Sequence, residues 1–145
     1  MNTVIASPRP TSYWIIAVVA LLWNLLGVVM FVMQVGMTPE QLAALPADQR
    51  SLHEAAPPWV NIAFGVAVFG GVLGALGLLM KKRWAVLMFL LSLLALAVQV
   101  VSVYAMTPAW QVQGPSGAIM PVVLVLIAVF LWWYARKAAA RGWIA

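Results

Sequence analysis

The side chains in this sequence that could do chemistry are a few amides and a hydroxyl set inside long apolar stretches. Such neutral groups can donate and accept hydrogen bonds, and a polar side chain in hydrocarbon is costly unless it has a partner. We therefore expect them to point into a helical bundle, where two interpretations remain open. They either hydrogen-bond between helices and fix the packing, or they line an outward-facing pocket for a neutral ligand. The candidate ligand-binding residues are Asn24, Gln34, Asn61, Gln99 and Ser102.

The sequence offers little else that could catalyse a reaction or hold a metal. It has no cysteine, which excludes thiol catalysis, zinc–thiolate sites and iron–sulfur clusters. No charged residue lies within the apolar stretches, so proton relays lack their usual groups. His53 and Glu54 could form an acid–base pair, but they read equally as neighbouring loop residues. Met30, Met33 and Met37 share a helix face and could bind copper(I) together with His53, although methionine is also an apolar filler. We expect no enzyme, no metal site and no cofactor.

The elements that hold these residues are predicted to be four membrane-spanning helices. The chain is 66% hydrophobic and 8% charged, whereas soluble domains are about 25% charged. Its four charge-free runs are long enough to cross a bilayer, which takes about 20 residues of helix, and backbone in hydrocarbon must satisfy its own hydrogen bonds. We expect one domain, an all-α bundle of the up-down type, with spans at 13–37, 59–80, 84–106 and 118–135.

The basic residues flank these spans on one predicted side. By the positive-inside rule this places both termini in the cytoplasm. The outer loops are then 38–58 and 107–117, and the cytoplasmic parts are loop 81–83 and tail 136–145. Because the basic residues are placed as topology signals, the sequence pI of about 10.3 gives no reason to expect nucleic-acid binding. The predicted topology anchors are Lys81, Lys82, Arg83, Arg136 and Lys137.

The tripeptide Met-Thr-Pro occurs twice, each time at the end of an outward-going span. Proline lacks the N–H that a helix interior needs, so each span ends there. After the first tripeptide we expect short surface helices in the first outer loop. Thr38 is predicted to be the N-cap of the first one, with Pro39 at its first position and Gln41 completing a capping box. The repeat itself indicates either two related helical hairpins or shared stop chemistry.

The second predicted span is rich in glycine. Gly70-x-x-x-Gly74 is a close-approach motif, which lets one helix backbone pack tightly against another. We assign Gly70, Gly74 and Gly77 to helix packing. Their neighbour is expected within the same chain, because four helices need close internal contacts. A second protomer is the alternative.

Three stretches carry a family resemblance: "MTPEQLAALPADQRSLHEAAPPWV", "AVFGGVLGALGLLMKKRWA" and "WWYARKAAARGW". They resemble a group of small four-helix proteobacterial inner-membrane proteins, which are often described as sugar transporters or simply as membrane proteins. A broader similarity, in span count, size and the glycine-rich second helix, is to DoxX-like membrane proteins. The resemblance implies a bacterial inner membrane and a four-helix bundle, and it assigns no catalytic residue.

Two function classes are favoured over an enzyme. The first, which we adopt, is a small integral inner-membrane protein that binds or transports a neutral small molecule or lipid. The second is an accessory subunit that stabilises a larger membrane complex. The expected partners are membrane lipids, with a homodimer or a larger membrane complex left open.

Overall fold

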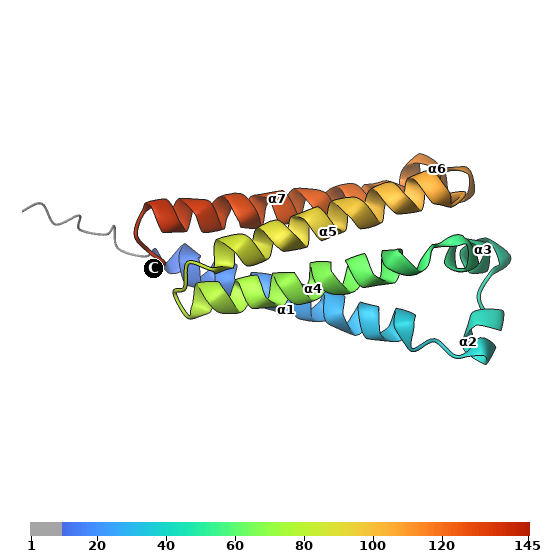
Figure 1. The fold of residues 1–145 in the computed structure, drawn as a ribbon, viewed down its shortest axis with the longest axis horizontal. Coiled ribbons are helices and arrows are strands. Elements are labelled where there is room, and N and C mark those ends of the chain that lie inside the picture. Colours follow the sequence, from blue (N-terminus) through green and yellow to red (C-terminus); the bar gives the residue numbers. More distant parts are fainter. Residues whose placement is uncertain (1–9) are drawn as a thin grey trace, which may run out of the picture.

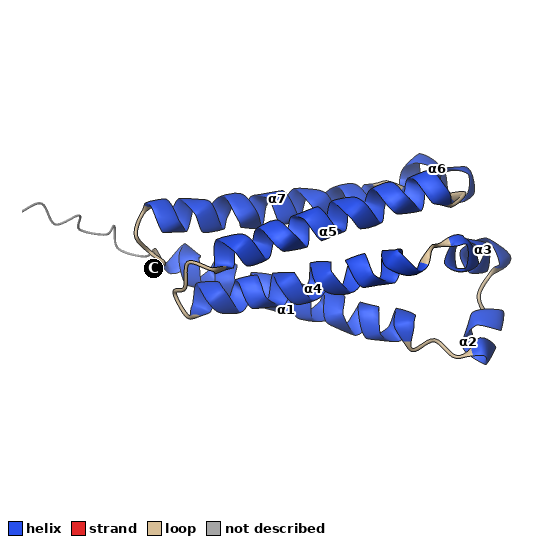
Figure 2. Cartoon of the chain, in the orientation of Figure 1, coloured by secondary structure: helices blue, strands red, loops and turns tan. Residues whose placement is uncertain are grey.

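The structure is a computed structural model that describes residues 10–145, and this range is helical with no strand (Figures 1 and 2). Four helices are long and apolar enough to cross a membrane, which confirms the prediction of an all-α fold. Three shorter helices lie between them. The seven elements are α1 (Thr11–Val35), α2 (Pro39–Ala43), α3 (Ala47–Ala55), α4 (Pro58–Leu79), α5 (Ala85–Met106), α6 (Ala109–Gly117) and α7 (Ile119–Ala140).

The bundle has two chemically different ends. Figure 1 shows α2, α3 and α6 together at one end, which we call the loop end. The α4–α5 turn and the C-terminus lie at the other end. We call this the basic end, because all five predicted topology anchors belong to the α4–α5 turn or to the last turns of α7. The main contacts between long helices follow chain order: α1 packs on α4, α4 on α5, and α5 on α7.

Helix α4 is the central element of the bundle. In its most apolar stretch 56% of the residues are buried, against 11% in α1 and in α5. Its glycines allow this burial. A Cβ atom added at Gly74 would lie 2.7 Å from Cδ1 of Phe89 on α5, and one added at Gly71 would lie 1.8 Å from Oδ1 of Asn24 on α1. Glycine therefore permits α4 to approach both neighbours closely.

The predicted packing glycines all contact α5 of the same chain. Added Cβ atoms would meet Ser92 and the Met88 carbonyl from Gly70, and Ala85 from Gly77, at 2.8–3.4 Å. The opposite side of α4 is also a packing surface, since Gly65 lies under the ring of Phe31 on α1. Both sides of α4 are thus used inside the chain.

The loop end begins with the capping box that the sequence predicts. The Thr38 N–H donates to Gln41 Oε1 at 2.9 Å, and the Gln41 N–H donates to Thr38 Oγ1 at 3.2 Å. Pro39 is the first residue of α2. At the second Met-Thr-Pro the threonine acts differently, because the Thr107 hydroxyl donates back to the Val103 carbonyl of α5. The first threonine thus begins α2, whereas the second bonds back to the helix α5 that it follows.

The structure adds helix to two regions that the sequence assigns to a loop and a tail. The predicted loop 107–117 contains α6, which is interrupted at Gly114, where φ is 65° and only glycine is unstrained. Helix α7 continues five residues past the predicted end of its span at 135. Its extra turns carry Arg136 and Lys137, whose cations lie 5.0 and 5.3 Å from the ring centroids of Trp132 and Trp133. Arginine and lysine favour the helical conformation, and their cations stack on the aromatic rings of the preceding turn. Both effects continue the helix beyond its apolar part.

The predicted tail 136–145 is also not a free tail. Helix α7 ends at Ala140 and is followed by Gly142, whose φ of 74° allows the hydrogen bonds from Gly142 N to Ala139 O and from Trp143 N to Ala138 O that define a Schellman cap. Trp143 and Ile144 are then buried in the core. Ala145 joins the α4–α5 turn through backbone hydrogen bonds to Lys81 and Arg83, of 3.0 and 2.8 Å. We call residues 142–145 the C-terminal hook.

The hook completes an aromatic cluster that closes the basic end. The Trp143 ring lies 5.9 Å from Tyr13 of α1 and 6.2 Å from Tyr134 of α7, between centroids. Tyr13 is fully buried and its hydroxyl donates to the Leu78 carbonyl of α4. The cluster therefore links the first and last long helices, which are not neighbours in the chain order of packing.

We expect Gly74→Ala to destabilise the bundle more than Gly70→Ala. Both changes gain helix propensity equally, but the Gly74 methyl meets the buried, rigid ring of Phe89, whereas the Gly70 methyl is near ordinary contact distance from Ser92. Overpacking of this kind costs about 1–3 kcal/mol. The measurement is the free energy of unfolding in mixed micelles by titration with sodium dodecyl sulfate. Equal stabilities for the two variants would contradict the packing described here.

We expect Trp143→Ala to destabilise the protein by about 3 kcal/mol, the usual scale for removing a buried aromatic side chain. Trp133→Ala is the matched control, because Trp133 is 52% exposed and Trp143 only 5%. The same titration compares the two variants. If the control lost as much stability as Trp143→Ala, the hook would not be part of the core.

Candidate functional site

A cavity of about 340 Å³ lies among the four long helices, and each of the four contributes to its wall. The wall is mostly apolar, with Trp23 and Val68 facing Phe89, Leu96 and Leu124 from the other helices. Polar side chains enter it at three positions only: Asn24 of α1, and Ser92 and Gln99 of α5. We call this space the central cavity.

Two of the three polar side chains already have partners in the chain. The Ser92 hydroxyl donates to the Ala67 carbonyl of α4 at 2.6 Å, and Asn24 Nδ2 donates to the Ala20 carbonyl at 2.8 Å. Within residues 10–145, Gln99 makes no side-chain hydrogen bond, although it is half-buried. Of the three side chains, Gln99 is thus the one with no hydrogen bond within the described residues, so its whole amide can donate and accept.

The structure divides the five predicted ligand-binding residues among three places. Asn24 and Gln99 line the central cavity. Gln34 Nε2 donates to Asn61 Oδ1 at 2.8 Å, which joins α1 to α4. The Ser102 hydroxyl accepts from Trp59 Nε1 at 3.0 Å, which joins α5 to α4. Both sequence interpretations therefore describe part of the set: some of these side chains join helices, and others face a cavity.

Sequence reasoning did not find the contribution of α7. Met120, Leu124, Ile127 and Leu131 line the central cavity from that helix. They are apolar residues in an apolar helix, and no sequence signal separates them from those that face outward. Ser92 lies seven residues before Gln99 and so on the same face of α5, but its bond to Ala67 depends on how closely α4 and α5 approach.

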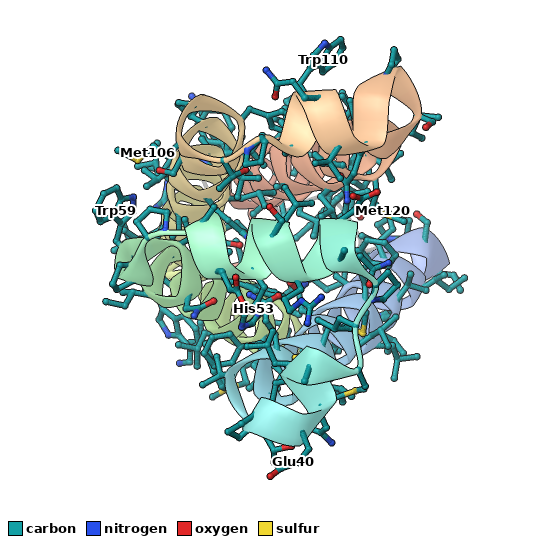
Figure 3. All side chains as sticks on the ribbon, turned by 90° about the vertical axis from the view of Figure 1, so that its right-hand side faces the viewer. Glu40, His53, Trp59, Met106, Trp110 and Met120 are labelled. Atoms are coloured by element: carbon teal, nitrogen blue, oxygen red, sulfur yellow. The ribbon has the colours of Figure 1, made fainter. Side chains whose placement is uncertain are left out.

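A second, larger cavity of about 610 Å³ lies at the loop end, under α2 and α3. Its wall is more polar, with three glutamines and a histidine: Gln34, Gln41, Gln49 and His53. Viewed from this end, α3 lies across the bundle with His53 beneath it, whereas Glu40 points away at the edge of the molecule (Figure 3). We call this space the loop-end cavity.

The loop-end cavity also contains the three methionines that the sequence grouped with His53. Met30, Met33 and Met37 all line it, but Met33 is 65% exposed on the outer surface. Within the described residues there is no group of three or more His, Cys, Asp or Glu side chains that could hold a metal. Copper(I) binding at the thioethers stays a prediction from the sequence.

The two cavities meet at a narrow level of the bundle. Met30 of α1 and Phe64 of α4 line both of them. The Phe64 ring is fixed by an edge-to-face contact with Phe31, at 5.5 Å between centroids. Among residues 10–145, neither cavity is lined by a lysine, an arginine, an aspartate or a glutamate. The arrangement can therefore hold a neutral molecule by hydrogen bonds and apolar contact.

Comparison of the chain with protein-family models, with curated proteins and with solved structures found no match. The family resemblances inferred from the sequence stay predictions.

Proposed function

We propose that this protein is a multi-pass membrane protein that binds a neutral, largely apolar small molecule or lipid in its central cavity, without catalysing a reaction. The observation that carries the proposal is the Gln99 amide. It is half-buried, it faces a cavity built by all four long helices, and within the described residues it has no hydrogen-bond partner.

Leaving the Gln99 amide without a hydrogen-bond partner costs free energy. An amide without a partner costs on the order of 4–8 kcal/mol on transfer to cyclohexane, and the half-buried Gln99 amide bears part of this cost. A ligand that offers one hydrogen-bonding group at Gln99 removes this cost. The remaining wall is apolar and uncharged, so the rest of the ligand is apolar and neutral. The cavity volume falls at the small end of the range of about 300–1,000 Å³ that is usual for ligand pockets.

The wall favours such a ligand over a sugar. A sugar carries a hydroxyl on most of its carbons, whereas the central cavity presents three polar side chains, two of which already donate to backbone carbonyls. The accessory-subunit alternative uses the glycines of α4 and the first outer loop as contact surfaces for another protein. Those glycines contact α5 and α1 of the same chain, which leaves that alternative the outer loop and favours the binding proposal.

We also propose that the four long helices span a bacterial inner membrane with both termini in the cytoplasm. The placement of Lys81, Lys82, Arg83, Arg136 and Lys137 at one end of the bundle supports this orientation. The outer surfaces of the helices are apolar, as lipid contact requires: Ile15, Leu22 and Leu94 are each more than half exposed.

Binding is tested by filling the cavity. Ala128→Phe places a ring in the central cavity from α7, and Val129→Phe, at the next residue, places the same ring on a surface that does not line it. We expect native mass spectrometry of the gently extracted protein to show a bound small molecule in the wild type and in Val129→Phe. Its occupancy should fall at least tenfold in Ala128→Phe and also fall in Gln99→Leu. Equal occupancy in all four proteins would reject the proposal.

Orientation is tested by single cysteines, which the cysteine-free chain allows without background. We expect a membrane-impermeant maleimide added to spheroplasts to label Gln49→Cys, on α3, within minutes. It should label Lys82→Cys, in the α4–α5 turn, only after the membrane is opened by detergent. The reverse pattern would place both termini outside.

A further inference from the structure

We infer that the ligand is an amphiphile with one hydrocarbon chain and an uncharged head, and that the two cavities form one site for it. The head occupies the loop-end cavity, the chain occupies the central cavity, and the junction between them lies beside Gln99. This inference rests on the proposed function and adds the class of ligand.

The first observation is that the two cavities share part of their walls. Met30 and Phe64 line both cavities, which are therefore adjacent, and the inferred site passes between these two side chains. We call this level the neck. The loop-end cavity is the larger of the two, at about 610 Å³ against 340 Å³. A molecule in the central cavity can therefore extend past the neck into a second, wider chamber.

The second observation is that Gln99 lies at the level of the neck. Phe64 is six residues from the loop-end terminus of α4, and Met30 is five residues from that of α1. Gln99 is seven residues from the loop-end terminus of α5. At about 1.5 Å of helix rise per residue, the three side chains are at similar depth. The Gln99 amide is thus placed to bond a group at the head–chain junction, such as an ester carbonyl or a hydroxyl.

The third observation is that polarity changes across the neck. On the loop-end side of the neck, the wall offers the amides of Gln41 and Gln49 and the imidazole of His53, which suit a hydroxylated head. On the basic-end side, the polar side chains that line the central cavity are Asn24 and Ser92, and both already donate to backbone carbonyls. The lower chamber thus presents hydrocarbon and aromatic surface. Its small volume suits one chain rather than two.

The absence of charge in the wall selects the head. No lysine, arginine or acidic side chain among residues 10–145 lines the loop-end cavity. Moving a phosphate or carboxylate head from water into this cavity would cost free energy, because no ionic partner replaces the water around it. A glycerol or similar polyol head needs only hydrogen bonds. A monoacylglycerol is the simplest probe with this chemistry.

The experiment uses the full chain in phosphatidylcholine nanodiscs and two monoacylglycerol photoprobes. One carries a diazirine at the end of its chain, and the other carries it on the glycerol. Crosslinked peptides are identified by mass spectrometry. We expect the chain probe to label central-cavity residues such as Leu96 and Leu124, and the head probe to label the segment 41–53. A tenfold excess of unlabelled monooleoylglycerol should reduce both signals severalfold.

The neck is tested by Phe64→Trp, with Phe69→Trp as the control at an exposed phenylalanine of α4 that lines neither cavity. We expect Phe64→Trp to lower labelling by the chain probe at least tenfold and the control to leave it unchanged. Gln99→Leu serves as a second variant that does not narrow the site. It should reduce the preference for the monoacylglycerol over an octadecene diazirine probe, which has no head.

The outcomes separate this inference from the proposed function. The two-chamber site is wrong if the chain probe labels the central cavity but the head probe labels lipid-facing residues. It is also wrong if the octadecene probe labels the cavity equally well. In both cases the central cavity still binds an apolar ligand, as the proposed function requires. The inference is also overturned if an oleate probe, with its charged head, competes as well as the monoacylglycerol. If no probe labels the interior and Ala128→Phe retains the wild-type ligand, both proposals fail.

Discussion

The close approach of α4 to both α1 and α5 is the contact on which the rest of this structure depends. Side chains at Gly71 and Gly74 would occupy the space that Asn24 and Phe89 fill. With α4 held between its two neighbours, α1 and α7 are left on opposite sides of the bundle, where larger side chains such as Trp23 and Leu124 separate them. Small residues allow α1, α4 and α5 to pack closely, and larger side chains keep α7 at a distance from α1. The central cavity is the space enclosed between these four helices.

The polar side chains within the long helices show what this geometry does to hydrogen bonding. Gln34 and Asn61 pair between α1 and α4, and Ser92 bonds to the backbone of α4 because glycine lets α5 come close. Each such contact contributes modestly, about 0.6 kcal/mol on average in membranes, but it fixes which faces meet. Gln99 differs because it faces the central cavity and, among residues 10–145, makes no hydrogen bond to a neighbouring helix. Glutamine therefore joins two helices at position 34 but lines a cavity at position 99.

The sequence predicts well those features that depend on local chemistry. Four apolar stretches of spanning length and the Thr38–Gln41 capping box need only neighbouring residues, and both are present. The end of α7 and the hook were missed because the burial of Trp143 depends on backbone bonds to Lys81 and Arg83, more than 50 residues away in the chain. At the candidate site, polarity identified Asn24 and Gln99, but Gln34 and Ser102 lie nearer the loop end of the same helices and bond to α4 there.

The closed basic end bears on whether the protein binds its ligand or passes it across the membrane. Tyr13, Tyr134 and Trp143 pack together below the central cavity, and the hook joins the α4–α5 turn by backbone hydrogen bonds. A path through the bundle would have to break this cluster and expose buried aromatic surface, at a cost of several kcal/mol. At the loop end the wider cavity is covered by two short helices, α2 and α3, which contain no buried residue. A sealed end and a lightly covered end favour a ligand that enters and leaves by the same route, as in a binding protein.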